Sequence, residues 1–240
     1  MLTSQASQRR EMCRWLETTD PSPIHNRSQD LYEHGTGDWV SRLPEWMRLI
    51  SGGSRCLWIQ GIPGAGKTVL MSHLINRLRD HADHSSNPII AIVYYYCYFG
   101  RAQDESGPFL RWLISQLCRQ AEKVPLNGSQ CFRRGGELTV SELFLFLESV
   151  LGLFETVYIV LDAIDESIRP RDNFLRVIRE LATVPRFSNT RFLASSRDHF
   201  DIEETMKSIS DQIPMTNSCV EEDIKQYVHS RLKNHPKFRV

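Results

Sequence analysis

The stretch Gly61-Ile62-Pro63-Gly64-Ala65-Gly66-Lys67-Thr68 decides the fold, because it matches the pattern G-x-x-x-x-G-K-T. It follows an apolar run at residues 56–59 and precedes an amphipathic segment at residues 67–80. Glycines in such a strand-to-helix turn let backbone N–H groups approach an anion, and the helix N-terminus presents its positive dipole end to the same anion. The stretch therefore predicts a phosphate-binding loop.

The residue types in this loop indicate a nucleoside triphosphate with Mg²⁺ as the ligand. In loops of this kind the lysine, here Lys67, contacts the β- and γ-phosphates, and the hydroxyl of Thr68 coordinates Mg²⁺. We expect the loop and the start of the helix to contact the nucleotide through Gly61, Pro63, Gly64, Ala65, Gly66, Lys67, Thr68 and Val69.

Outward from the loop, strand patterns alternate with helical patterns. The expected strands are residues 56–59, 89–99, 157–161, 190–194 and 211–215, and the expected helices are residues 67–80, 108–121, 141–152, 173–181 and 220–233. A polar loop is expected within residues 122–138. This alternation predicts an α/β fold, a three-layer P-loop NTPase whose mainly parallel sheet is flanked by helices, with ligands at the carboxyl ends of the strands.

Three regions are expected along the chain. Residues 1–54 are interpreted as a mostly helical or irregular N-terminal extension and linker that contributes to the nucleotide site. It holds a short helix at residues 9–17, which Pro21 and Pro23 would end, and an amphipathic helix at residues 39–50. Residues 55–219 form the P-loop NTPase core. Residues 220–240 are a C-terminal helix that begins a further, downstream region.

An acidic segment follows the third expected strand. Asp162 comes directly after the apolar run at residues 157–161, where a metal-side carboxylate of a nucleotide site is expected, so we assign it with Thr68 to Mg²⁺. Asp165 and Glu166 are candidates to orient or deprotonate the attacking water, with Glu166 preferred. Many hydrolytic P-loop enzymes carry that acid immediately after the metal-side aspartate, and this chain has Ala163 there. The choice of base, and whether either acid is catalytic, stays open.

Arg197 ends the next expected strand, in the segment Ser195-Ser196-Arg197-Asp198. Because parallel strands end at one edge of the sheet, we expect it to emerge beside Asp162. A guanidinium there would detect the γ-phosphate or stabilise charge that develops during its transfer. We therefore count Arg197, with Lys67, Asp165 and Glu166, among the candidate catalytic residues.

Composition excludes several other classes of protein. Among 240 residues, Lys+Arg and Asp+Glu both number 29, so no net charge favours nucleic acid or an anionic membrane. The N-terminus lacks a hydrophobic signal region, no apolar run is long enough to span a bilayer, and the six cysteines show no CxxC pair. We expect a cytoplasmic protein that binds neither nucleic acid nor membrane.

Together these motifs resemble the NACHT-type NTPase domain of the STAND class of signalling ATPases. They are most similar to the fungal nephrocystin-like N-terminal NTPase domain over roughly residues 13–230. The likeness is carried by Gly35-Thr36-Gly37-Asp38-Trp39, by residues 57–68, by Leu161-Asp162-Ala163-Ile164-Asp165-Glu166 with its small residue after the aspartate, and by residues 195–198.

This resemblance implies a nucleotide-controlled signalling switch that uses ATP more than GTP. It also implies that the segment before the phosphate loop helps hold the base, so Gly35, Thr36 and Trp39 are adenine-side candidates. Trp39 is equally well interpreted as an apolar anchor that fixes the extension to the core. The implied partners are other protein domains or a second copy of the chain.

Two alternatives of different classes remain. The first is an interaction scaffold, or a fragment of a larger repeat-containing sensor, that binds nucleotide without hydrolysing it. The second is a small-molecule phosphotransferase, for which the polar loop at residues 122–138 would have to act as the lid.

Overall fold

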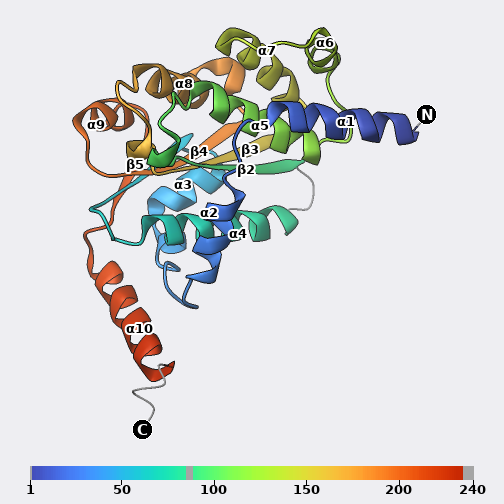
Figure 1. Cartoon of the computed structure of the whole chain (residues 1–240). Coiled ribbons are helices and arrows are strands. Elements are labelled where there is room, and N and C mark those ends of the chain that lie inside the picture. The colour runs from blue at the N-terminus through green and yellow to red at the C-terminus, as the bar shows by residue number, and fades with distance from the viewer. Residues whose placement is uncertain (1, 85–88, 235–240) are drawn as a thin grey trace.

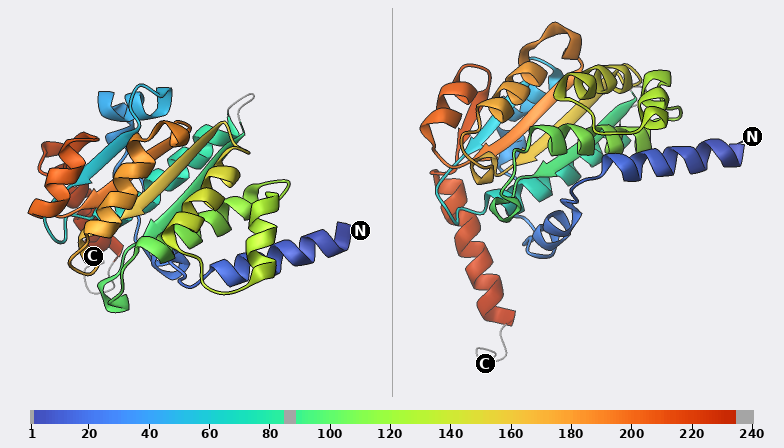
Figure 2. Two further views of the ribbon diagram at one scale, coloured as in Figure 1. Left: turned by 90° about the horizontal axis from the view of Figure 1, so that it is seen from above. Right: turned by 45° about the horizontal axis from the view of Figure 1, so that its top comes forward.

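A five-stranded parallel sheet forms the centre of the chain. The computed structural model describes residues 2–84 and 89–234. The strands are β1 (Cys56–Gln60), β2 (Ile90–Tyr96), β3 (Thr156–Asp162), β4 (Thr190–Ser196) and β5 (Asp211–Pro214). Their spatial order is β2-β3-β4-β1-β5, and each hydrogen-bonded pair is parallel (Figure 2). The predicted α/β architecture is confirmed, and each strand lies within a few residues of its expected position.

The strand register brings the motifs to one edge of the sheet. Ile59 pairs with Ser195 and Gln60 with Ser196, so the phosphate loop leaves β1 beside the end of β4. On the other side of β4, Leu161 pairs with Ala194, so Asp162 ends β3 level with Ser195. Every residue from Val157 to Asp162 is buried, as a strand covered on both faces requires.

Helices cover both faces of this sheet (Figure 1). One face carries α1 (Leu2–Leu16), α5 (Ser106–Gln120), α6 (Leu126–Arg134), α7 (Val140–Leu151), α8 (Asp172–Thr183) and α9 (Phe200–Lys207). The other face carries α2 (Ser22–Asp30), α3 (Pro44–Ser51) and α4 (Lys67–Asp83). Short 3-10 helices η1 to η4 lie at Val40–Arg42, Phe99–Arg101, Ile164–Glu166 and Pro185–Phe187. Each face has its own cluster of buried apolar side chains, so the N-terminal extension is part of the packed body.

The open edge of β2 is covered by amide side chains of α5. Gln116 accepts from the backbone N–H of Tyr94 at 3.3 Å and donates to its carbonyl at 2.8 Å. Gln120 makes the same pair of bonds with Ile92, at 3.3 and 3.0 Å. Because an unpaired strand edge is a template for strand addition, these two side chains close an edge on which another chain would otherwise pair.

Three helices lie where none was expected. Pro21 and Pro23 were expected to end the first helix, but α1 already ends at Leu16 and the two prolines lie at the start of α2. Proline is favoured there because it lacks the N–H that the first helical turn leaves unbonded. α6 occupies part of the expected polar loop. It contains Gly128, at which a Cβ would collide with the ring of Phe146, so this glycine is required by packing and does not mark a turn. α9 follows β4 and buries Ile202 and Met206.

The last described helix, α10 (Ser218–Asn234), projects away from the body (Figures 1 and 2). It starts two residues before the expected helix. Within the described residues, no helix is both long enough and apolar enough to pass through a membrane.

Candidate nucleotide-binding site

The phosphate loop, residues 61–68, is fixed to the sheet at its first residue. The N–H of Gly61 donates to the carbonyl of Ser196 at 3.2 Å. A Cβ at Gly61 would lie 2.7 Å from that of Met215, so close packing excludes any larger residue there. Gly64 and Gly66 have φ values of 79° and 85°, which favour glycine, and Gly66 is the N-cap of α4. The loop therefore curves back over the N-terminus of α4, where helices bind anions.

Lys67 lies inside this curve. Its Nζ donates to the carbonyls of Gly61 at 2.6 Å and Ile62 at 2.9 Å. Burial lowers the pKa of Lys67, while the carboxylates of Asp165 and Asp162 act in the opposite direction. The lysine is thus placed between the loop backbone and two acids, where a phosphate would be a further anionic partner.

Asp162 is a buried carboxylate at the end of β3, with 2 % of its surface exposed. It accepts a hydrogen bond from the hydroxyl of Ser195. Burial raises its pKa to about 6, although the hydroxyls of Ser195 and Thr68 act to lower it. Since burial disfavours the charged form, a cation held beside Asp162 would stabilise the carboxylate.

Ala163 turns the chain immediately after Asp162. It adopts φ 58° and ψ 48°, a left-handed conformation that is uncommon for residues other than glycine. Its N–H donates to the Ser195 hydroxyl at 3.2 Å, and η3 begins at the next residue. This turn carries Asp165 and Glu166 toward the phosphate loop instead of along the strand direction.

Arg197 meets both of these acids. Its backbone N–H donates to Asp165 Oδ1 at 2.9 Å, and its Nε lies 3.1 Å from Asp165 Oδ2. Its other contact, to Glu166 Oε1, is longer at 3.9 Å. The side chain of Asp165 is 4 % exposed and that of Glu166 is 28 % exposed, so Glu166 is the acid that solvent reaches. Burial raises the pKa of Glu166, and a hydrogen bond from the backbone N–H of Phe99 opposes the change.

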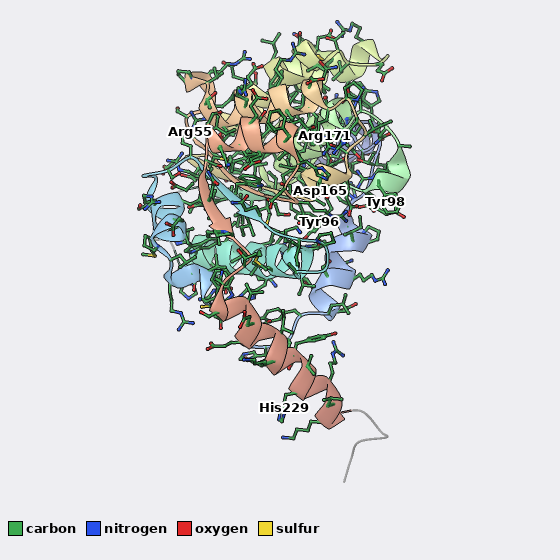
Figure 3. All side chains as sticks on the ribbon, turned by 90° about the vertical axis from the view of Figure 1, so that its left-hand side faces the viewer. Arg55, Tyr96, Tyr98, Asp165, Arg171 and His229 are labelled. Atoms are coloured by element: carbon green, nitrogen blue, oxygen red, sulfur yellow. The ribbon has the colours of Figure 1, made fainter. Side chains whose placement is uncertain are left out.

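These residues enclose a cavity of about 270 Å³, which we name the phosphate cavity. It is lined by Pro63, Gly64, Ala65, Gly66, Lys67, Thr68, Val69, Asp162, Ala163, Asp165, Glu166 and Arg197. The predicted catalytic residues and the predicted Mg²⁺ ligands therefore lie together around one space. Asp165, labelled in Figure 3, marks the position of this cavity at the sheet edge.

The donor set fits Mg²⁺. This ion prefers oxygen ligands and binds through one or two protein side chains together with substrate phosphates and water. Thr68 and Asp162 provide a hydroxyl and a buried carboxylate that line the same cavity. They are the residues that would hold the ion.

A second cavity, of about 370 Å³, adjoins the first, and we name it the nucleoside cavity. The two share Gly64, Ala65, Gly66 and Val69. The other residues that line the nucleoside cavity are Leu31, Tyr32, Glu33, Thr36, Gly37, Leu70, Met215, Val220, Asp223, Ile224 and Tyr227. A mostly apolar space directly beside a phosphate loop has the character of a site for a nucleoside.

The predicted adenine-side residues divide into two groups. Thr36 lines the nucleoside cavity, whereas Gly35 and Trp39 do not. The indole of Trp39 is 6 % exposed and packs among apolar residues, and its Nε1 donates to Asp223 at 2.9 Å. Trp39 thus has the position of the apolar anchor that the sequence left as an alternative.

Several residues of the site were not predicted from the sequence. Ser195 had a signal, because it is a hydroxyl residue at the end of an apolar strand. Asp223 also had one, as an acid within the apolar stripe of α10 between Val220 and Ile224. Tyr32 had none, since only the folded chain brings it against His73, whose ring stacks on it at 4.4 Å and 8°.

Comparison with known proteins agrees with this geometry. Residues 35–197 match the family model described as nephrocystin 3, N-terminal. The chain is 25 % identical over 190 residues to the vegetative incompatibility protein HET-E-1 of Podospora anserina, in an alignment that covers 75 % of this chain. It spans only 13 % of the length of that relative.

Two solved structures share the fold. Drosophila ORC bound to DNA matches with a TM-score of 0.53 and 13 % identity, over 95 % of this chain and 52 % of that one. Cdc6p from Pyrobaculum aerophilum matches with a TM-score of 0.51 and 14 % identity, over 84 % and 53 %. At such identities the likeness concerns the fold alone.

The family match covers well over half of the chain, and the phosphate loop lies within it. The chain therefore belongs to the nephrocystin 3 N-terminal family, as a nucleotide-binding P-loop NTPase domain related to the corresponding region of HET-E-1.

Proposed function

We propose that this domain binds ATP with Mg²⁺, hydrolyses it slowly, and acts as a signalling switch controlled by the bound nucleotide. The observation that carries the proposal is the convergence of Lys67, Asp162 and Arg197 on one phosphate cavity that opens into an apolar nucleoside cavity. The first cavity supplies groups that suit a triphosphate, and the second supplies walls that suit a base. The N-terminal extension contributes Thr36 and Gly37 to the second cavity.

We assign each polar side chain of the phosphate cavity a role in this function. Lys67 and the N-terminal N–H groups of α4 bind the β- and γ-phosphates. Thr68 and Asp162 hold Mg²⁺, which neutralises phosphate charge when bound. Glu166 orients the attacking water and accepts its proton while the bond from the γ-phosphorus to the bridging oxygen breaks. Asp165 holds Arg197, which contacts the γ-phosphate.

Turnover should be slow because the position after Asp162 carries no acid. Ala163 occupies it, and the nearest alternative acids, Asp165 and Glu166, lie further along the chain in η3. Slow hydrolysis gives long-lived triphosphate and diphosphate states, as a switch requires. The states would differ at Arg197, Asp165 and Glu166, and we propose that this difference biases contacts with other protein domains or with a second copy of the chain.

Binding is tested by isothermal titration of MgATP, with GTP as a competitor, into wild type, Lys67→Ala and a control, Lys123→Ala. Lys123 is exposed and lines neither cavity. Lys67→Ala should lose most of the affinity for ATP, and Lys123→Ala should keep it. Unchanged affinity in Lys67→Ala would contradict the proposal.

A scaffold that binds nucleotide without hydrolysing it is the second candidate. The pairing of Arg197 with Asp165, together with Ala163 after the metal-side aspartate, supports it. Phosphate release measured on wild type and on Asp162→Ala/Glu166→Gln separates the two functions, since identical background rates would favour the scaffold. The phosphotransferase alternative has lost its support, because α6 packs on α1 and α7 and lines neither cavity.

A further inference from the structure

Helix α10 forms the outer wall of the nucleoside cavity, although most of its length projects from the body (Figure 1). Val220, Asp223, Ile224 and Tyr227, all within residues 218–227 of the helix, line the cavity. His229, labelled in Figure 3, lies on the half that extends beyond the body. Besides the phosphate loop, the start of α4 and Met215, the cavity is thus lined by two parts of the chain that are far apart in sequence, the segment at residues 31–37 and α10.

Asp223 joins α10 to the N-terminal segment that carries Gly37 and Trp39. Its Oδ2 accepts the backbone N–H of Gly37 at 2.8 Å and the indole N–H of Trp39 at 2.9 Å. Trp39 is buried in the cluster beneath α4, so its indole is a fixed donor. One carboxylate oxygen that accepts two N–H groups, one of them from a rigid side chain, holds this point of the helix against the body.

Little else in the described part of the chain attaches α10. Val220 is buried, and Gln226 donates to the carbonyl of His34 at 2.7 Å. By contrast, Ile224, Val228 and Leu232 are about half exposed. A helix with so few buried contacts is held weakly, so a ligand that bridges it to the body would change its docking measurably.

We propose that Asp223 is a positioning residue that couples occupancy of the nucleoside cavity to the docking of α10. The inference rests on the proposed nucleotide binding and adds the partner element that reads it. The two cavities share the loop residues Gly64 to Gly66, so a nucleoside attached to loop-bound phosphates enters the space between α4 and α10. There it contacts α10 only while Asp223 holds the helix in place, and its binding energy favours the docked helix in return.

The residues that line the two cavities explain why we assign this coupling to the nucleoside and not to the phosphates. Tyr32 and Tyr227 both line the nucleoside cavity, and Tyr32 is supported by the stacked ring of His73. Aromatic faces of this kind stack on bases. No residue of α10 lines the phosphate cavity, so inorganic triphosphate has no contact there through which to sense the helix.

The first test compares two ligands, MgATP and magnesium triphosphate without a nucleoside, by titration into wild type, Asp223→Ala and Glu222→Ala. Glu222 is the matched control, since it is an exposed acid on the same helix and lines neither cavity. Asp223→Ala should weaken ATP about tenfold or more, or ~1.4 kcal/mol, and change triphosphate by less than about twofold. Glu222→Ala should change neither. An unchanged ATP affinity in Asp223→Ala, or equal losses for both ligands, overturns the inference.

The second test uses the wild-type chain and so does not depend on how a variant folds. Trypsin cleavage after Lys225 and Arg231 of α10 is followed without ligand, with MgATP and with magnesium triphosphate. ATP should slow cleavage several-fold, and triphosphate should not. Equal protection by the two ligands, or none by ATP, overturns the coupling. Failure of the proposed function is distinct, because in that case neither ligand would bind in a way that depends on Lys67.

Discussion

Arg197 is paired with Asp165 through both its backbone and its side chain. The backbone N–H lies 2.9 Å from Oδ1 and the guanidinium Nε lies 3.1 Å from Oδ2. The carboxylate of Asp165 therefore fixes the direction in which β4 ends, and it leaves the terminal guanidinium nitrogens directed toward Glu166 and the phosphate cavity. The two adjacent acids therefore differ in their contacts, because Asp165 holds Arg197, whereas Glu166 is left more exposed beside the phosphate cavity.

Replacing Arg197 with alanine should affect the recognition of ATP more than that of ADP. A guanidinium at this edge would contact the γ-phosphate, which ADP lacks, and a hydrogen bond between charged groups contributes about 1.5–3 kcal/mol. We therefore expect ATP affinity to fall by about tenfold and ADP affinity to change by less than about twofold, both measured by isothermal titration. The Arg197 side chain is 44 % exposed, but its loss leaves the buried carboxylate of Asp165 without its ion-pair partner, so stability should fall by about 1–3 kcal/mol.

Arg169→Ala is the control for this experiment. Arg169 is exposed at the same end of the sheet, where it bonds His199, and it does not line the phosphate cavity. It should leave both affinities unchanged. Equal losses for ATP and ADP in Arg197→Ala would assign Arg197 to general structure and not to the γ-phosphate.

The stability of the fold should depend on pH through His25. Its Nδ1 lies 2.9 Å from the Tyr96 hydroxyl, its Nε2 lies 3.1 Å from the Gln29 amide nitrogen, and its ring stacks on Tyr94 at 4.4 Å. Burial first, and then the charge of Arg79, lower its pKa to about 4 from the ordinary 6.5. Between these two values the unfolded chain binds a proton that the folded chain excludes.

His25 therefore stabilises the fold more at neutral pH than at acidic pH. Its contribution to the free energy of unfolding is fully present above about pH 6.5 and is lost as the pH falls toward 4, up to about 3 kcal/mol in total. His25→Asn should lower stability at pH 7 but flatten its decline toward pH 4, as measured by urea unfolding at several pH values. His229→Asn, which changes an exposed histidine on α10, should keep the wild-type slope. An unchanged slope in His25→Asn would contradict this assignment.

The sequence predicted those parts of the site that depend on a single strand end or turn. The phosphate loop, Asp162 and Arg197 each follow an apolar run, and parallel strands place such ends at one edge without further information. The residues that sequence reasoning missed depend on contacts between distant segments. The role of Asp223 depends on its hydrogen bonds with Gly37 and Trp39, which lie more than 180 positions earlier in the chain.

The missed helices have a related explanation. Proline and glycine were interpreted as breaks, yet Pro21 and Pro23 lie at the start of a helix, where proline is favoured. Gly128 lies inside α6, where packing against Phe146 outweighs its poor helix propensity. The capping pattern Thr139-Val140-Ser141-Glu142 was available in the sequence and would have placed the start of α7 one residue earlier.

Gly128 allows a direct test of that explanation. Helix propensity alone predicts that Gly128→Ala stabilises the protein by about 1 kcal/mol. Because the new Cβ would collide with the Phe146 ring, we expect the opposite sign, a loss of about 1–3 kcal/mol in the free energy of unfolding. Gly107→Ala in α5 is the matched control, since no atom lies within 4 Å of its Cβ position, and it should be neutral or stabilising. A stabilised Gly128→Ala would mean that α6 does not pack as described.

The two acids of η3 should separate in their effects on hydrolysis. Glu166 is the more exposed acid, and burial raises its pKa toward the range in which a carboxylate accepts a proton from water. Glu166→Gln keeps the size and shape of the side chain and removes its charge, so the local structure should persist. We therefore expect phosphate release from ATP to fall by about 100-fold, while ATP affinity stays within about threefold of wild type.

Asp165→Asn is the informative companion to this variant, because it weakens the hold on Arg197 and leaves Glu166 in place. It should lower ATP affinity in the manner of Arg197→Ala and reduce phosphate release at saturating ATP much less than Glu166→Gln does. Both quantities are obtained from phosphate release measured across a range of ATP concentrations. If Asp165→Asn instead abolishes release while Glu166→Gln retains it, the base is Asp165, and the pairing with Arg197 orients that base. If neither variant differs from wild type, hydrolysis does not pass through η3, which leaves the phosphate cavity a binding site alone.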